Sequence, residues 1–358
     1  MDKIAEFWNR VERSLFAQLD WCVEVLTPKH RHLALVLELV RIEEHIRPDW
    51  IRRRGRKRSD RKALARAFVA KSLLNLSTTK ALIERLLCDT TLRQLCGWDT
   101  GRAIPSESTF CRCFAEFAET RFADSVHEAL VETHLADDLI WHISRDSTAI
   151  PARERVHPKA DKPKPKRGRP RKTDPPPAPK RMFKQLVQSA TEAIAELPKN
   201  CDVGIKPDAS GRRHPWVGYK LHVDVADGCL PISAITTSAS LHDSQAAIPL
   251  AKMTAGRVTS LYDLMDSAYD AFTIREASEL LGHVPIIDSK RVAGQAKTPM
   301  EPDRAYRYRN RTTVERFNSQ LKDNHGGRNI RVRGQPKVHA HLMFGIIVVF
   351  AEALLGLL

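Results

Sequence analysis

The first 136 residues carry the hydrophobic spacing of amphipathic helices. Apolar residues recur every three or four positions along "HLALVLELVRIEEHI" and "RKALARAFVAKSLLNL", and charged residues occupy positions between them. "STTKALIERLLCD" begins with Ser and Thr, which commonly cap helix N-termini. In "PSESTFCRCFAEFAE", Phe110, Phe114 and Phe117 fall on one helical face. The pattern predicts an all-α N-terminal domain over residues 1–136.

A dense basic run, "RPDWIRRRGRKRSDRK", separates the first two of these helices. It is either a solvated connector or a segment that contacts phosphates, and in so basic a chain the two readings carry similar weight. Several short helices around a basic connector fit a DNA-binding module of the helix-turn-helix kind, although no spacing here decides the question.

Strand patterns begin at about residue 137. "DDLIWHISRDSTAI" alternates and is rich in β-branched residues, which predicts a strand that ends near Asp146. "WVGYKLHVDVADGCLPISAITTSAS" predicts two strands joined in a hairpin at Ala-Asp-Gly. A strand in "RVTSLYDLMD", a helix in "AFTIREASELLG" and a strand in "HVPIID" follow. Residues 137–358 are therefore predicted to form a mixed α/β sheet flanked by helices.

A basic, Pro-rich insertion interrupts this predicted domain at about residues 153–207. Its first part, "HPKADKPKPKRGRPRKTDPPPAPK", cannot bury a core and is expected to be extended or disordered. A helix in "FKQLVQSATEAIAEL" is predicted to follow it.

The C-terminal segment "HLMFGIIVVFAEALLGLL" is apolar enough to raise the question of a membrane span. It is about one helical turn short of a comfortable span, and it contains Glu352. We therefore expect a buried core helix and no association with a membrane.

The charge of the chain points to a polyanionic partner. Lys and Arg number 58 against 43 acidic residues, which gives a formal charge of +15, and the pI is near 9.7. Nucleic acid is favoured over a membrane surface because the sequence shows no lipidation motif or signal peptide. The seven cysteines form no paired CxxC spacing, which is typical of reduced thiols in a cytosolic protein.

Three carboxylates occupy positions suited to chemistry. Asp146 is at the end of the first predicted strand, Asp266 closes "SLYDLMD", and Glu315 is on a late helix. Ends of neighbouring strands are where open α/β sheets gather their active sites. Two Asp and one Glu form an all-oxygen set that suits Mg²⁺ or Mn²⁺ rather than zinc. Nothing in the spacing alone shows that the three converge.

The late helix, "YRNRTTVERFNSQLK", places a single acid among cations. At about 100° per residue, Tyr308, Arg311, Glu315 and Lys322 fall within an arc of roughly 60°. One face would then present a metal-binding carboxylate beside groups that hold phosphates. The alternative is an ordinary Arg311–Glu315 ion pair on a solvated face, worth a few tenths of a kcal/mol.

The spacing Tyr308-x2-Arg311-x3-Glu315-x6-Lys322 resembles the Y-R-E-K signature of bacterial insertion-sequence transposases of the DDE class. "RDSTAI" and "LMDSAYDA" are similar to the segments that bear the first and second Asp of that family, and "VGYKLHVDV" to its second strand. The resemblance spans about residues 137–350. It implies a ribonuclease-H-like fold, with Asp146, Asp266 and Glu315 holding two Mg²⁺ ions, for which Mn²⁺ can substitute.

The same resemblance implies an enzyme that cuts DNA and transfers strands, works as at least a dimer on double-stranded DNA, and resides in the bacterial cytoplasm at the nucleoid. Arg311, Lys322 and Tyr308 would contact phosphates. Two alternatives stay open: a non-cutting DNA-binding protein descended from a transposase, and a metal-dependent nuclease of the same fold. Only 48 residues separate Asp266 from Glu315, too few for the large β-rich insertion that some members carry there.

The insertion contains a second resemblance. "KRGRPRK", residues 166–172, is similar to an AT-hook. Gly168 would permit a close approach to DNA, while Arg167 and Arg169 would enter a narrow A·T minor groove. A basic, proline-rich linker is the alternative, because so short a motif arises readily by chance.

Overall fold

The computed structural model describes residues 10–11, 26–47, 59–156, 180–207, 210–290 and 299–357. The basic run between the first two helices falls largely outside these ranges, and the AT-hook-like segment falls entirely outside them. Predictions that concern those two segments stay predictions.

The N-terminal region is helical, as the hydrophobic spacing predicts. Its helices are α3 (Pro28–Val40), α4 (Arg61–Leu73), α5 (Thr79–Cys88), α6 (Thr90–Cys96), α7 (Glu107–Glu119) and α8 (Phe122–Leu135), with short 3₁₀ turns at Ile42–His45 and Gly101–Ala103. The expected cap of α5 is confirmed, since the Thr78 side chain accepts a hydrogen bond from the Ala81 amide. The three phenylalanines of α7 are buried and pack around Phe68 of α4.

In the C-terminal region, the described residues form a six-stranded mixed sheet. Its strands are β1 (Leu139–Pro151), β2 (Asp202–Pro207), β3 (Arg213–Ala226), β4 (Leu230–Ser238), β5 (Thr259–Met265) and β6 (Val284–Ile287). The order is β2-β3-β1-β5-β6, and β4 also pairs with β3. β1, β5 and β6 run parallel, whereas β3 is antiparallel to β1, β2 and β4. This mixed α/β architecture agrees with the predicted ribonuclease-H-like fold.

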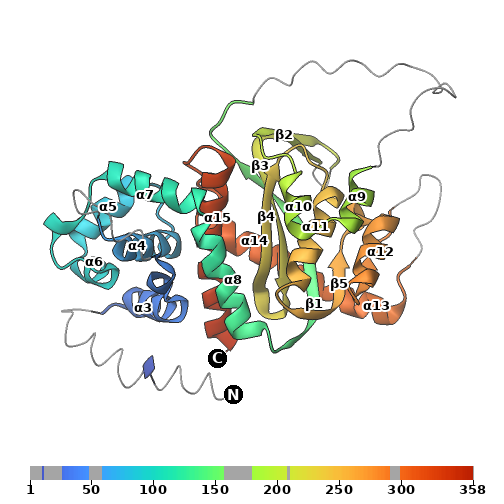
Figure 1. Ribbon diagram of the computed structural model, residues 1–358, viewed down its shortest axis with the longest axis horizontal. Helices are drawn as coiled ribbons and strands as arrows, with labels where there is room; N and C mark the ends of the chain where they lie inside the picture. Colours follow the sequence, from blue (N-terminus) through green and yellow to red (C-terminus); the bar gives the residue numbers. More distant parts are fainter. Residues whose placement is uncertain are drawn as a thin grey trace.

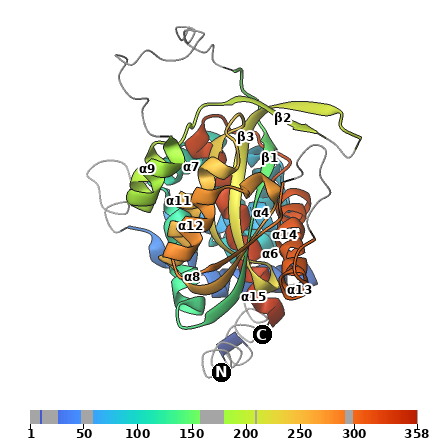
Figure 2. The same cartoon turned by 90° about the vertical axis from the view of Figure 1, so that its right-hand side faces the viewer.

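Two local features of this region differ from the prediction. The helix expected over "FKQLVQSATEAIAEL" is two helices, α9 (Arg181–Val187) and α10 (Ala190–Ala195), because Ser189 forms a capping box with Glu192 that starts a new helix. The strand β2, which follows α10, was not predicted at all. Figure 2 shows β2 and the first part of β3 reaching beyond the rest of the sheet.

Helices cover both faces of the sheet (Figure 1). α11 (Ser244–Ala255), α12 (Phe272–Leu280), α9 and α10 lie on one side. On the other side lie α14 (Thr312–Asn324) and α15 (Gln335–Leu357). The chain enters α14 through α13 (Pro302–Tyr308) and a 3₁₀ turn, η7 (Arg309–Arg311). α15 contacts β4 and also α3, α4, α7 and α8, so one apolar core joins the N-terminal helices to the sheet.

α15 is the core helix that the sequence predicts. It is the one helix of the described ranges that is long and apolar enough to cross a membrane, and 72% of its most apolar window is buried inside the protein. Glu352 has a structural role in it: the carboxylate accepts hydrogen bonds from His32 Nε2 at 2.8 Å and Gln320 Nε2 at 3.1 Å. The His325 imidazole lies 3.0 Å away. Glu352 therefore ties α15 to α3 and α14.

Candidate active site

Asp146 lies on β1, inside the sheet. The strand does not end there, as the sequence pattern predicted, but continues because its backbone stays paired with β3 as far as Pro151 and Gly218. Burial raises the pKa of Asp146 to about 6, and the like charge of Asp266 acts in the same direction. A backbone hydrogen bond and nearby cations oppose this shift only in part. A carboxyl group in this state is stabilised as an anion by an added cation.

The register of the sheet brings Asp266 next to Asp146. β1 and β5 run parallel with Arg145 paired to Met265, and Asp146 and Asp266 are the next residues along the chain. Asp266 directly follows β5, and its Oδ1 accepts a hydrogen bond from the Ala268 amide at 2.9 Å. Two carboxylates therefore share the edge where parallel strands of open sheets gather ligands.

Arg145 anchors β1 directly beside this pair. Its side chain is 1% exposed, and its Nε and Nη2 atoms donate to the Asp224 carboxylate at 2.8 and 2.7 Å. Asp224 also accepts a hydrogen bond from Thr254 Oγ1 at 2.7 Å, and Asp263 Oδ1 lies 3.9 Å from Arg145 Nη2. These contacts join β1 to β3 and β5. The position of Asp146 is consequently fixed by the core of the protein.

Glu315 reaches the same part of the molecule on α14, but it pairs with an arginine. α14 packs on β1, and Asn318 Nδ2 donates to Asp146 Oδ2 across 3.4 Å. The Glu315 side chain is 55% exposed, and its Oε1 accepts a hydrogen bond from Arg311 Nη2 at 2.6 Å. Among the described side chains, no three of His, Cys, Asp or Glu lie close enough together to hold a metal ion. Two of the three predicted carboxylates are adjacent, and the third is held by Arg311.

The helix predicted over residues 308–322 is not continuous. α13 ends at Tyr308, η7 occupies residues 309–311, and α14 begins at Thr312. A 3₁₀ turn has fewer residues per turn than an α-helix, so the uniform rotation of about 100° per residue assumed for Tyr308 to Lys322 does not hold across residues 309–311. Arg311 nevertheless remains near Tyr308, with Cζ 5.9 Å from the ring centroid.

Cations surround the two aspartates. Burial lowers the pKa of Arg311, but the surrounding anions, Asp146, Asp266 and Glu315 among them, outweigh burial and raise that pKa above its ordinary value. Burial also lowers the pKa of Lys322, and the like charge of Lys206 on β2 lowers it further. The charge of Lys206 also acts on Asp146. The site therefore combines carboxylates with cations that suit a phosphate backbone.

The sequence did not single out two residues at this site, Lys206 and Asp288. Asp288 follows β6 as Asp266 follows β5, and since Met265 pairs with Ile287, the two aspartates are neighbours along the edge of the sheet. An Asp directly after a predicted strand was the available signal for Asp288. Lys206 had no such signal, because β2 was not predicted.

Comparison with known families decides the affiliation. A family model described as Transposase DDE domain matches residues 146–350, which is more than half of the chain. The chain belongs to the DDE transposase family. A second model, described as Transposase domain (DUF772), matches residues 23–116, which covers α3 to most of α7. No curated protein matches the chain.

The chain is thus a DDE transposase of an insertion sequence, an enzyme that cuts DNA and transfers strands. The match to the DDE model begins at Asp146 and includes Asp266, Glu315 and most of α15. Proteins of this family act on DNA and generally depend on a divalent metal ion. Asp146 and Asp266 fit such an ion, because they are adjacent oxygen donors and because burial makes an unneutralised charge on Asp146 costly.

Proposed function

We propose that Asp146, Asp266 and Glu315 form the catalytic triad of this transposase and hold two Mg²⁺ ions, for which Mn²⁺ can substitute. The observation that carries the proposal is the Arg145–Met265 register, which puts the two aspartates side by side beneath α14. When bound, such a metal pair activates the attacking oxygen and stabilises the leaving oxygen in phosphoryl transfer.

The Arg311–Glu315 ion pair is a resting arrangement in this proposal. The pair is half exposed on the Glu315 side, and exposed ion pairs contribute only about 0–1 kcal/mol. Glu315 can therefore leave Arg311 at little cost and turn towards the aspartates. This exchange frees the Arg311 guanidinium, which binds a DNA phosphate through two parallel hydrogen bonds.

Three further groups hold the DNA backbone at the site. Lys322 contributes a compact positive charge from α14, and Lys206 contributes another from β2. Tyr308 donates a hydrogen bond to a phosphate from its half-buried hydroxyl group. The aspartates and the cations together select a phosphodiester positioned over the edge of the sheet.

The remaining parts of the chain recognise and assemble the DNA. In our proposal the helical domain, residues 1–136, binds the terminal repeats of the element, and residues 137–358 are the catalytic domain. Arg167, Gly168 and Arg169 anchor the protein in A·T-rich minor grooves. Strand transfer joins two element ends to one target, so the active species is a dimer on DNA. The protein works in the bacterial cytoplasm, at the nucleoid.

The test compares wild type with Glu315→Gln on a plasmid that carries both ends of the element, in the presence of Mg²⁺. Strand nicking and end joining are scored on gels, and a gel-shift assay measures DNA binding separately. Glu279→Gln is the matched control, because Glu279 is an exposed glutamate on α12. We expect Glu315→Gln to bind DNA and to lose cleavage and joining, while Glu279→Gln retains both.

Other outcomes discriminate between the readings. Equal activity of wild type and Glu315→Gln would remove Glu315 from the triad. Cleavage without any joined product would favour a nuclease, and binding without cleavage by wild type would favour a non-cutting descendant. The plasmid result with Asp146→Asn then shows whether the Asp146–Asp266 pair is needed independently of Glu315.

A further inference from the structure

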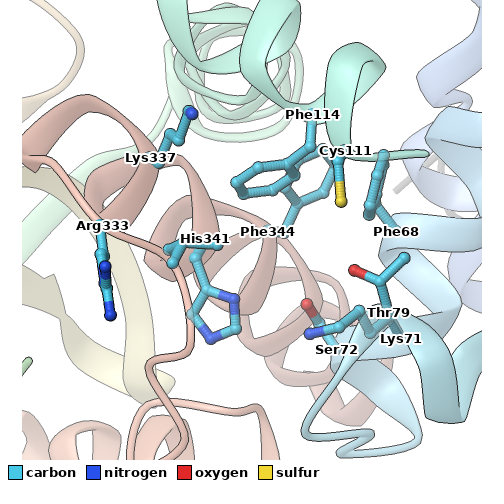
Figure 3. Close-up of a pocket in the computed structure, with 11 residues that line it drawn as sticks. Phe68, Lys71, Ser72, Thr79, Cys111, Phe114, Arg333, Lys337, His341 and Phe344 are labelled. Atoms are coloured by element: carbon cyan, nitrogen blue, oxygen red, sulfur yellow. The ribbon is translucent and has the colours of Figure 1, made fainter. Parts of the chain in front are cut away.

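A cavity of about 290 Å³ lies between the N-terminal helices and α15. Its walls come from α4, α5, α7, α15 and the segment that precedes α15, and none of these carries Asp146, Asp266 or Glu315. Figure 3 shows Arg333 and Lys337 on one side of the cavity and Phe68 and Cys111 on the other. Pockets for small molecules typically enclose roughly 300–1,000 Å³, so this cavity has the size of a compact ligand.

Three cations line the cavity without acidic partners. They are Lys71 on α4, Arg333 before α15, and Lys337 on α15. Within the described ranges of the chain, no carboxylate forms an ion pair with any of the three. Burial lowers the pKa of Lys71 to about 8, and no anion offsets that effect. A half-buried ammonium group left without a counter-charge is a binding group for an external anion.

The rest of the lining is mostly apolar and hydroxylic, with the Cys111 thiol and the His341 imidazole. Phe68, Phe114 and Phe344 close the cavity on its core side, with the Phe68 and Phe344 ring centroids 5.5 Å apart and those of Phe114 and Phe344 6.2 Å apart. They are 3%, 9% and 2% exposed, so they offer a ligand a small apolar surface and no free ring face. The hydroxyl groups of Ser72 and Thr79 lie beside Lys71 (Figure 3). A planar aromatic ligand that carries hydrogen-bonding edges and a negative charge matches each of these walls.

We propose that this cavity binds one unpaired nucleotide, with the base against the apolar side of the cavity and the phosphate among Lys71, Arg333 and Lys337. Basic groups that hold the phosphates beside an apolar surface that covers the bases are a common arrangement in proteins that bind single-stranded nucleic acid. The nucleotide comes either from the bound DNA or from a free mononucleotide. Only the first source rests on the transposase function; nucleotide binding itself does not.

The chain has an internal reporter for this cavity. Cys111 lines it and is exposed, whereas Cys88, at the end of α5, is exposed and is not among the residues that line it. Full-length protein is treated with iodoacetamide, an uncharged reagent, and the alkylation rates of the Cys111 and Cys88 peptides are read separately by mass spectrometry. The added probes are adenosine 5′-monophosphate, a short single-stranded oligodeoxynucleotide, a blunt duplex of the same sequence, and inorganic phosphate.

We expect the single-stranded oligonucleotide or the mononucleotide to slow alkylation of Cys111 several-fold and to leave Cys88 unchanged. Protection by the oligonucleotide identifies DNA as the source, and protection by the mononucleotide alone identifies a free nucleotide. Both results support the proposal. Absence of protection by either nucleotide probe, equal protection of both cysteines, or equal protection by inorganic phosphate would overturn it.

Variants make the test specific. Lys71→Gln and Arg333→Gln should each abolish the protection, whereas Lys62→Gln, at the exposed start of α4, should keep it. Arg333 is exposed, so its substitution tests the cavity even if Lys71→Gln unfolds the protein. Glu315→Gln separates the cavity from the catalytic triad: this variant should lose DNA cleavage and keep full protection of Cys111 from alkylation. Failure of the cavity proposal is thereby distinguished from failure of the catalytic triad.

Discussion

Two arginine–carboxylate pairs lie close to Asp146, and they differ in almost every respect. Arg145 and Asp224 are 1% and 0% exposed, and two hydrogen bonds join them. Arg311 and Glu315 are 18% and 55% exposed, and one hydrogen bond joins them across the boundary between η7 and α14. The first pair lies between strands in the core, and the second lies on a helix that packs over the same strand.

The difference in burial gives the two pairs different roles: the buried pair holds a strand in position, and the more exposed pair can exchange partners. A buried pair cannot lose one partner without leaving a charge in the core, so Arg145 and Asp224 hold β1 in place. A pair whose carboxylate is half exposed loses less when it opens, because water takes the place of the lost partner of Glu315. Glu315 and Arg311 are therefore free to take other partners. Asp146 belongs to the rigid part of the site, and Glu315 belongs to the exchangeable part.

The largest expected effect comes from breaking the buried pair. Arg145→Met leaves Asp224 charged and without its main partner in the core, which should lower the free energy of unfolding by about 3–5 kcal/mol. Urea denaturation at neutral pH measures it. Arg328→Met is the control, because the Arg328–Asp323 pair is exposed, and it should cost less than about 1 kcal/mol. Equal losses in the two variants would show that burial does not distinguish the pairs.

Asp146 should make stability depend on pH in the opposite sense to a salt-bridged aspartate. Its pKa is about 6 in the folded protein and 3.8 without perturbation, so the stabilising contribution is present below pH 4 and is lost as pH rises through 6. Two pKa units correspond to about 3 kcal/mol at most. In chelator-containing buffer, the free energy of unfolding of Asp146→Asn relative to that of wild type should therefore increase as the pH is raised from 4 to 7.

Unfolding of both proteins at these two pH values measures that gain. Asp323→Asn should show no such gain, because interactions with Arg328 and Ser319 lower the pKa of Asp323. A constant difference between Asp146→Asn and wild type across the range would contradict the account of Asp146.

A smaller loss of stability is expected when Glu352, the partly buried carboxylate of α15, is replaced. Burial would raise the pKa of Glu352, but hydrogen bonds and charges from His32 and His325 outweigh it and lower that pKa to about 2. The stabilisation is present above pH 4.5 and is lost as pH falls towards 2. Glu352→Gln should cost about 1.5–3 kcal/mol at pH 7. Thermal unfolding should show the deficit shrinking below pH 4, and a deficit that does not change with pH would exclude a charge effect.

The smallest effect belongs to the exposed pair. A double-mutant cycle with Arg311→Gln and Glu315→Gln should give a coupling free energy below about 1 kcal/mol. Denaturant unfolding of the four proteins provides it. A coupling as large as that of a buried pair would mean that Glu315 is fixed on Arg311 and is not free to exchange.

The sequence identified the carboxylates better than it identified their arrangement. Asp146 and Asp266 could be found because each belongs to a strand pattern, and strand ends of α/β sheets gather ligands. Their adjacency depends on the register of β1 and β5, which no local pattern reveals. Asp288 also follows a predicted strand, but only the register of β5 and β6 places it beside Asp266.

Helix continuity was a second limit of the sequence. Periodicity predicted one helix over residues 308–322, but a 3₁₀ turn separates Tyr308 from Glu315. Such a turn changes the phase of the helix without changing which residues are apolar. The N-terminal helices and the core helix α15 could be predicted, because their long apolar faces are buried as the pattern requires.

The central claim, that Glu315 exchanges Arg311 for the two aspartates, is tested most directly by a crystal structure with Mn²⁺ and a DNA end, using anomalous scattering to locate the metal. The account predicts Mn²⁺ bound by Asp146, Asp266 and Glu315, with the Arg311–Glu315 pair broken and Arg311 on a phosphate. An intact Arg311–Glu315 pair beside Mn²⁺ held by the aspartates alone would contradict it.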